Sequence, residues 1–273
     1  MNRHSDLLEA VFNALSSAKE SFERRLFIVI GGLDKTENAM IEILENMQID
    51  SILVTSNFKK FRNRIGQVLD NNATTISCWD TDKILGRTYN IAIIDLRDWP
   101  DVIALSRATG TVRGGGIIFV MLPFDYKTKT YYQEIVPPFC KKQPRKIMLE
   151  RIIKKSVKHE GVYVYDADKE IFIWKPKEKA RRYERKKIEV PKDVLIPKKI
   201  YELVASQDQI NVLKAFENWQ EYIILLANRG RGKSASIGLG LTGYATLFAK
   251  KHKRAFFVCL TSRSILNVEE IFR

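Results

Sequence analysis

The feature that most restricts the fold of this chain is a series of short apolar runs, separated by stretches with the spacing of amphipathic helices. The runs are LFIVIGG (26–32), SILVTS (51–56), TTISCW (74–79), NIAIIDL (90–96) and GGIIFVML (115–122). Helical spacing is found at residues 5–25, 36–47 and 58–70. Because strands that alternate with helices pair in parallel, we predict a doubly wound, mostly parallel α/β sheet that helices cover on both faces. The residues of the first helix that we expect to face the core are Leu8, Val11, Phe12, Leu15, Ala18 and Phe22.

The chain divides into two predicted domains. The sequence GVYVYDADKEIFIWK (161–175) predicts a β-hairpin that turns at Asp166–Lys169 and closes a first domain of residues 1–175. Prolines punctuate the next segment, which we interpret as a basic linker over residues 176–199. Residues 200–273 form the second predicted domain.

Positive charge is concentrated in the predicted linker. The formal net charge is +14 and the pI about 9.6, a balance typical of proteins that contact nucleic acid. Residues 175–199 hold eleven basic and four acidic side chains, so they carry half of the excess. Two interpretations stay open: a solvated linker that its lysines keep extended, or a strip that binds RNA phosphates. The residues that would bind RNA are Arg181, Arg182, Lys186 and Lys187.

Composition argues against several classes of protein. The longest apolar runs have the length of strands, and the first twenty residues lack the apolar core of a signal peptide, so neither a membrane span nor secretion is predicted. Three cysteines and three histidines are widely scattered, which predicts buried thiols and no metal cage. We therefore expect a cytoplasmic protein, and no pattern predicts its oligomeric state.

The stretch ILLANRGRGKSASIGLG (224–240) predicts a nucleotide site. EYIILLA (221–227) is predicted to be a strand, followed by a glycine-containing loop and an amphipathic helix over 234–252, as in the phosphate-binding loops of ATPases. The pattern predicts that Lys233 bridges the β- and γ-phosphates of ATP and that the Ser234 hydroxyl binds Mg²⁺, although Ala227 replaces the first glycine of the motif. The predicted ATP-binding residues are Arg229, Gly230, Arg231, Gly232, Lys233, Ser234 and Ala235.

A glutamine upstream of this loop is a candidate for contacting the base. Gln209 lies in LVASQDQINVLKAFENW (203–219), where Ser206 or Asp208 can cap a helix. A side-chain amide can donate to adenine N7 and accept from the 6-amino group. The alternative is an ordinary surface glutamine, and the residues alone leave both interpretations open.

Three features of the first domain resemble ligand sites, and we interpret each as structural. Ile30–Gly32 ends a strand before a helix but lacks the third glycine of a dinucleotide site, which favours a tight turn. Asp95 follows an apolar strand, as the magnesium-binding aspartate of ATPases does, but we expect it to cap the next turn. Gly114–Gly116 could bind an anion with Arg113, but a flexible entry into a strand is favoured.

The segments quoted above resemble the tRNA(Met) cytidine acetyltransferases and their rRNA-acetylating relatives. Similar to the family's helicase-like module are SQDQINVLKAF (206–216), RGRGKSASIGL (229–239), AFFVCLTS (255–262) and SILNVEEIF (264–272). Similar to its N-terminal domain are ILGRTYNIAIIDL (84–96) and GTVRGGGIIFVMLP (110–123). The resemblance covers nearly the whole chain and is weakest over residues 125–200.

The resemblance implies an enzyme that acetylates the exocyclic amine of a cytidine in RNA from acetyl-CoA, supported by ATP hydrolysis in a P-loop, helicase-like module. It also implies tRNA as the partner and favours Gln209 as an adenine contact. In the family the acetyltransferase domain follows the ATPase module. We therefore expect an N-terminal part that contains no catalytic residue and no acetyl-CoA contacts, and that is inactive by itself.

The sequence supports two hypotheses for the function, from different classes of protein. The first is the ATP-binding, RNA-facing part of an RNA cytidine acetyltransferase. The second is a stand-alone basic module that binds ATP or RNA without catalysis. A RecD-type helicase fragment is a further alternative, which the loop allows and the first domain disfavours.

Overall fold

The computed structural model describes two compact units, residues 1–183 and 184–273, and each is considered by itself. The described residues are 5–47, 51–69, 73–98, 101–126, 147–177, 184, 188–218, 222–227, 232–253 and 258–261. No helix among them is both long enough and apolar enough to cross a lipid bilayer.

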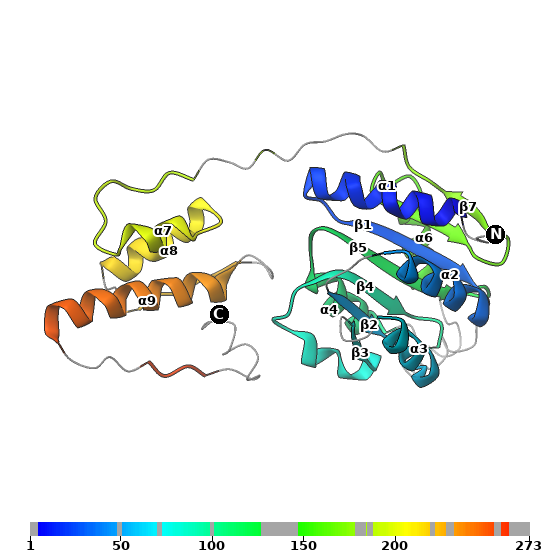
Figure 1. Cartoon of the computed structure of the whole chain (residues 1–273), viewed down its shortest axis with the longest axis horizontal. Helices are drawn as coiled ribbons and strands as arrows, with labels where there is room; N and C mark the ends of the chain where they lie inside the picture. Colours follow the sequence, from blue (N-terminus) through cyan, green and yellow to red (C-terminus); the bar gives the residue numbers. More distant parts are fainter. Residues whose placement is uncertain are drawn as a thin grey trace. The chain divides into compact units, whose positions relative to one another are not determined.

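Unit 1 is built on a seven-stranded sheet with the strand order β3-β2-β4-β5-β1-β6-β7 (Figure 1). The strands are β1 (Arg25–Gly31), β2 (Ile52–Thr55), β3 (Ala73–Ile76), β4 (Tyr89–Asp95), β5 (Val112–Pro123), β6 (Val162–Asp166) and β7 (Ile171–Trp174). Every pairing is parallel except that of β7, which runs antiparallel to β6. The predicted α/β fold with a mostly parallel sheet is therefore confirmed, including the hairpin near residue 166.

Helices cover both faces of this sheet. One face carries α1 (Ser5–Ser21), α2 (Leu33–Glu45) and α3 (Lys59–Leu69), and the other carries η2 (Cys78–Ile84), α4 (Val102–Thr111) and α6 (Ile147–Ser156). Alternate strand residues enter alternate cores. In β1, Phe27 and Val29 pack under the first group of helices, whereas Ile28 and Ile30 pack under the second. The period of two in a strand thus produces two apolar layers from one continuous apolar run.

The first helix is shorter than predicted, and its core-facing side is confirmed in part, because Val11 and Ala18 are buried and Leu8 and Leu15 pack against the core. It ends at Ser21 rather than residue 25, and Phe12 and Phe22, predicted to be buried, are exposed. The buried residues are Leu7, Ala10, Val11, Ala14, Ala18 and Ser21. Phe22 lies beyond the helix with φ 57°, over Gly114, where an added Cβ would lie 2.7 Å from its ring. Gly114 and Gly115 let the end of α1 and the turn after it approach β5, and Gly116 lies against the Asn90 carbonyl of β4, so packing explains these glycines without an anion.

A second boundary also differs from prediction. The run TTISCW was predicted as one strand, but β3 ends at Ile76 and Cys78 begins the 3₁₀ segment η2. The Ser77 hydroxyl accepts a hydrogen bond from the Trp79 N–H at 3.4 Å, which caps this segment. A local cap therefore ends a strand that the apolar pattern would have continued.

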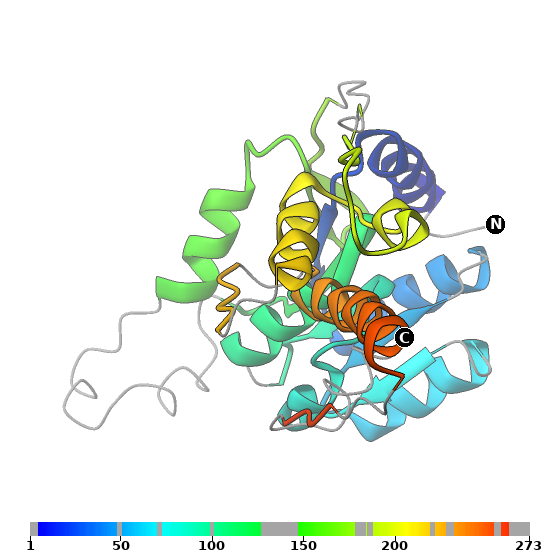
Figure 2. The ribbon, with the colours of Figure 1, turned by 90° about the vertical axis from the view of Figure 1, so that its left-hand side faces the viewer.

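Unit 2 contains α7 (Lys198–Glu202), α8 (Gln207–Glu217) and α9 (Lys233–His252). Figure 2 shows α8 and α9 crossing each other. They approach closely at a glycine, because a Cβ added at Gly240 would overlap the ring of Phe216. A Cβ added at Gly243 would lie 2.6 Å from Ile196, in the segment before α7. The Glu217 carboxylate, at the end of α8, accepts hydrogen bonds from the Leu195 and Ile196 N–H groups at 2.7 and 2.8 Å. These bonds fix the segment before α7 to the end of α8.

The prediction of a strand over 221–227 is wrong for those of its residues that the structure describes. Residues 222–227 carry no strand pairing, and neither do residues 258–261, within the segment 255–262 that resembles the family's helicase-like module. Ile224 and Leu226 are 82% and 91% exposed, whereas Ile223 between two exposed neighbours packs against the core of unit 2. An apolar run becomes a strand only through hydrogen bonds to a neighbouring strand, and the described part of unit 2 supplies none.

Candidate nucleotide-binding loop and a buried ion-pair network

The candidate nucleotide site begins where helix α9 starts. Gly232 is its N-cap and adopts a left-handed conformation with φ 76° and ψ 25°, which glycine reaches without a steric penalty. Its carbonyl accepts from the Ser236 N–H at 2.9 Å and from the Ser236 hydroxyl at 2.8 Å. No side chain caps the first turn among the described residues. The N–H groups at the start of such a helix have no intrahelical acceptor, and an anion can bind there.

Lys233 spans the mouth of the loop. Its Nζ donates a hydrogen bond of 2.5 Å to the carbonyl oxygen of Ala227, six residues earlier. This contact joins the two sides of the loop and holds the ammonium near the helix N-terminus. Ser234 and Ala235 lie in the same first turn, with Ser234 half-buried and Ala235 exposed. The structure thus brings Gly232, Lys233 and Ser234 together.

Gln209 contacts this helix start from α8. Its side chain is 6% exposed; Oε1 accepts from the Ala205 N–H at 2.6 Å and Nε2 donates to the Gly232 carbonyl at 3.3 Å. The Ser206 hydroxyl caps α8 by accepting from the Gln209 N–H, as the sequence predicted for either Ser206 or Asp208. A primary amide has two N–H groups and two acceptor lone pairs, so these two bonds use half of its capacity. The interpretation of Gln209 as an ordinary surface glutamine is therefore wrong, because its side chain is buried against Gly232.

The remaining predicted site residues cannot be located in this way. Arg229, Gly230 and Arg231 of the loop lie outside the described residues. The same holds for the candidate RNA-binding residues Arg181, Arg182, Lys186 and Lys187. Their roles stay predictions from the sequence.

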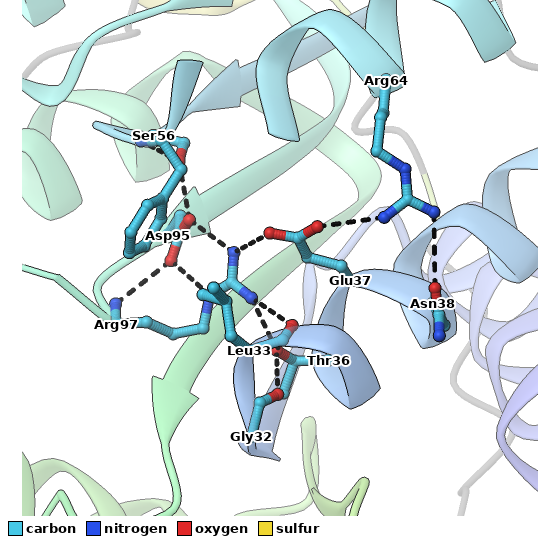
Figure 3. A network of polar contacts seen from close by, with 10 residues as sticks. Gly32, Leu33, Thr36, Glu37, Asn38, Ser56, Arg64, Asp95 and Arg97 are labelled. Atoms are coloured by element: carbon cyan, nitrogen blue, oxygen red, sulfur yellow. Dashed lines mark hydrogen bonds and ion pairs between the residues drawn. The ribbon is translucent and has the colours of Figure 1, made fainter. Parts of the chain in front are cut away.

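Unit 1 contains a polar cluster that the sequence did not predict, at the carboxyl edge of the parallel sheet (Figure 3). Arg97, two residues after β4, is 2% exposed. Its guanidinium forms a bidentate pair with Asp95, through Nε and Nη2, at 2.8 Å each. Nη2 also donates to Glu37 at 3.3 Å, and Nη1 donates to the Thr36 hydroxyl and the Leu33 carbonyl at 2.8 Å each.

Every N–H of this guanidinium therefore has a partner. Glu37 in turn accepts from Arg64 at 3.2 Å, and Asp95 accepts from the Ser56 hydroxyl at 2.7 Å, so two cations balance two carboxylates. The guanidinium carbon also lies 5.3 Å from the ring centroid of Phe58. Buried charges of this kind persist only when they are paired and fully hydrogen-bonded, and this network meets both conditions.

Two structural interpretations made from the sequence are confirmed here. Asp95 accepts from the Arg97 backbone N–H at 3.1 Å, so it caps the turn after β4. Gly31 and Gly32 form the turn between β1 and α2, where the Gly32 N–H donates to the Asp168 carboxylate at 3.0 and 3.1 Å. A Cβ at Gly31 would lie 3.2 Å from Ala167. The glycines admit the β6–β7 hairpin, and Asp168 holds the position that a phosphate would take in a dinucleotide site.

Sequence inspection missed the network because its members come from α2, β2, α3 and the end of β4. The only local indication is the pair Asp95 and Arg97, two residues apart at the end of an apolar strand. Glu37 and Arg64 lie within helices whose charges look like ordinary surface residues. Only the parallel pairing of β2 with β4 brings Ser56 and Asp95 to one edge.

Comparison with known proteins relates both units to one group. The model of the family described as tRNA(Met) cytidine acetyltransferase TmcA, N-terminal, matches residues 1–167. A tRNA(Met) cytidine acetyltransferase TmcA of Pyrococcus abyssi is 34% identical over 79% of this chain and 28% of its own length. Proteins of the same name from Thermofilum pendens and Thermococcus kodakarensis are 31% and 30% identical, over 97% and 98% of this chain and 36% and 38% of their own lengths. The chain thus spans less than two fifths of each of these relatives.

Proposed function

Because this chain belongs to the tRNA(Met) cytidine acetyltransferase family, we propose that it is the ATP-binding, RNA-facing part of an enzyme that forms acetylcytidine in tRNA from acetyl-CoA and ATP. The observation that carries the ATP part is the start of α9, where a left-handed glycine, a lysine and a hydroxyl follow each other. The RNA part is supported by the names of the relatives and by the net charge of +14.

The described residues fit the triphosphate of a nucleotide with Mg²⁺. Gly232 leaves no Cβ in the loop, the first-turn N–H groups of α9 face it, and Lys233 would exchange the Ala227 carbonyl for phosphate oxygens. The Ser234 hydroxyl would hold Mg²⁺. Bound ATP would supply phosphoryl-transfer chemistry. This chain matches less than two fifths of the length of each relative named above. We propose that acetyl transfer depends on the parts of those relatives that this chain does not match.

Replacing Lys233 tests the nucleotide site. Lys233→Ala should weaken the binding of a fluorescent ATP analogue by about ten- to a hundredfold, since a hydrogen bond to a charged group is worth about 1.5–3 kcal/mol. Lys250→Ala is the matched control, because Lys250 is an exposed lysine in the last turn of the same helix. Equal affinity in the Lys233→Ala and Lys250→Ala proteins would mean that this loop is not the site.

Gln209 requires a test that separates base recognition from support of the loop, because its amide already holds the Gly232 carbonyl. We propose that its second N–H and second lone pair contact adenine. Gln209→Leu should then lower affinity for ATP more than affinity for inorganic triphosphate, which has no base. An equal loss for both ligands would assign Gln209 to the loop alone.

The basic segment can be tested through the salt dependence of RNA binding. If Arg181, Arg182, Lys186 and Lys187 contact phosphates, their replacement by Gln should flatten the slope of log affinity against log salt. On single-stranded RNA, the slope should change by about 0.7 for each phosphate that the protein no longer neutralises. An unchanged slope would leave this segment as a linker.

A further inference from the structure

Unit 1 has a cavity at the carboxyl edge of its parallel sheet, beside the Arg97 network. Its volume is about 270 Å³. The residues that line it are Gly31, Gly32, Leu33, Phe58, Arg97, Pro123, Phe124 and Asp125. They come from the ends of β1 and β5, the turn after β4 and the segments before α2 and α3. In doubly wound sheets this edge is where ligands bind, because the connections diverge there and leave a crevice.

Apolar and aromatic groups dominate the lining. Phe124 is 69% exposed and Leu33 is 46% exposed, so two large apolar side chains face solvent beside the cavity. Phe58 also lines the cavity, and the guanidinium carbon of Arg97 lies 5.3 Å from the centroid of its ring. Phe58 is partly buried and also packs against the core, whereas an exposed aromatic residue beside a cavity, such as Phe124, is typical of a binding surface.

The polar groups of the cavity exclude a phosphate and favour an uncharged ligand that donates hydrogen bonds. All N–H groups of Arg97 have protein partners, so this cation offers no donor to an anion. The Asp168 carboxylate already accepts from the Gly32 N–H, and the Asp125 carboxylate lines the cavity. An anion here would meet the like charge of Asp125, whereas a ligand amino group could donate to it, because a carboxylate has acceptor sites for more than one hydrogen bond.

The volume of the cavity limits the size of the ligand that it can hold. A cavity of about 270 Å³ lies just below the range of about 300–1,000 Å³ that drug-sized ligands occupy, so it suits a single ring system. Lys59 and Lys60 follow Phe58 directly and are exposed, so cations for a phosphate backbone lie outside the cavity, next in sequence to its aromatic wall. An uncharged ring inside and phosphates outside is the arrangement of an unpaired nucleotide in single-stranded RNA.

We propose that this cavity binds one unpaired nucleobase of RNA, with its ring against Phe124 and Phe58 and its exocyclic amino group at Asp125. The inference rests on RNA as the partner in the proposed function. It adds a second RNA contact, in unit 1, that is separate from the basic segment and from the ATP loop.

The decisive variant is Phe124→Ala, because this exposed side chain can be removed without opening the core. Affinity of the full chain for a labelled single-stranded oligocytidine, measured by fluorescence anisotropy at fixed salt, should fall about tenfold, as expected for the loss of one base stack. Phe124→Trp should restore it. Phe12→Ala, which removes another partly exposed phenylalanine of unit 1, is the control and should leave affinity unchanged.

Base preference tests the role of Asp125. Cytosine and adenine carry an exocyclic amino group and uracil does not, so oligocytidine and oligoadenosine should bind more tightly than oligouridine. Asp125→Asn should reduce that preference. Cytidine monophosphate should compete only weakly, and competition as strong as that of the oligomer would identify a free-nucleotide site and overturn the proposal.

The outcomes separate this inference from the proposed function. If the chain binds RNA but Phe124→Ala binds it equally well, the base site is wrong and the RNA partner stands. If the unaltered chain binds tRNA but none of the oligomers, the base site is also wrong and the RNA partner stands; if it binds neither, both are wrong. ATP-analogue binding should be the same in the Phe124→Ala and unaltered proteins, since Phe124 is not among the residues proposed to bind ATP.

Discussion

The two units contain similarly apolar sequences but bury them to different extents. In unit 1, a run such as Ile117–Leu122 is paired on both sides and covered on both faces, and every one of its side chains is buried. In unit 2, residues 222–227 are equally apolar, yet one side of the run packs on the helices and the other is exposed. The comparison shows that apolar sequence specifies burial only when the surrounding elements supply both a hydrogen-bonding neighbour and a cover.

Glycine serves both units in the same way. Gly114 lets the turn after α1 approach β5, and Gly240 lets α8 approach α9. In each case the space of a missing Cβ is filled by a phenylalanine ring, Phe22 or Phe216. Close packing therefore does not distinguish the units. Among the residues that the structure describes, they differ in the two-faced sheet of unit 1.

The largest expected effect is on thiol reactivity. Cys78 is 1% exposed in unit 1 and burial raises the pKa of its thiol to about 12, whereas Cys259 in unit 2 is exposed. At pH 8 iodoacetamide should modify Cys259 at least about a thousandfold faster, because Cys78 reacts only after an opening that costs about 5 kcal/mol or more. Peptide mass spectrometry measures each site, and similar rates would mean that unit 1 opens readily around Cys78.

The next effect concerns the buried network of unit 1. Arg97→Leu leaves the carboxylates of Asp95 and Glu37 buried without their cation, so the free energy of unfolding of unit 1 should fall by about 3–5 kcal/mol. Arg64→Ala, whose side chain is 39% exposed, should cost about 1 kcal/mol or less. Urea unfolding followed by hydrogen exchange in β4 and α9 reports the units separately. Equal costs for the two arginines would contradict the network's role, and a matching loss in α9 would show that the units are coupled.

The smallest effect compares two helical glycines. Gly240→Ala should destabilise unit 2 by about 1–3 kcal/mol, because the new methyl group would overlap the ring of Phe216. Gly66→Ala in α3 should stabilise unit 1 by up to about 1 kcal/mol, because its Cβ would meet open space and alanine favours helices. Thermal unfolding of each variant measures the two shifts, and shifts of the same sign would show that α8 and α9 do not pack closely at Gly240.

Most of unit 1 could be predicted because its pattern is local. Strands over 26–32, 90–96 and 115–122 were predicted nearly at their observed bounds, since each run is apolar, β-branched and ended by a turn residue. The errors fall where a local contact competed with that pattern. The Ser77 cap ends the strand before Cys78, and the bend at Phe22 ends α1 early.

The candidate sites divide along the same line. Gly232, Lys233 and Ser234 could be identified from sequence because a phosphate-binding loop is built from consecutive residues. The lining of the cavity beside Arg97 could not, since it is assembled from the ends of strands that lie far apart in the chain. The burial of Gln209 against the loop also required the packing of α8 on α9.

The sequence by itself determined that this chain would form parallel α/β structure in its first domain, where the phosphate-binding motif lies and which family it resembles. These properties depend on neighbouring residues and on backbone periodicity. The tertiary structure decided which charges are buried, because Arg97 meets Glu37 and Thr36 only when α2 crosses the carboxyl edge of the sheet. It also decided that residues 222–227 carry no strand pairing, because a strand's hydrogen bonds belong to its neighbour and are not written in its own residues.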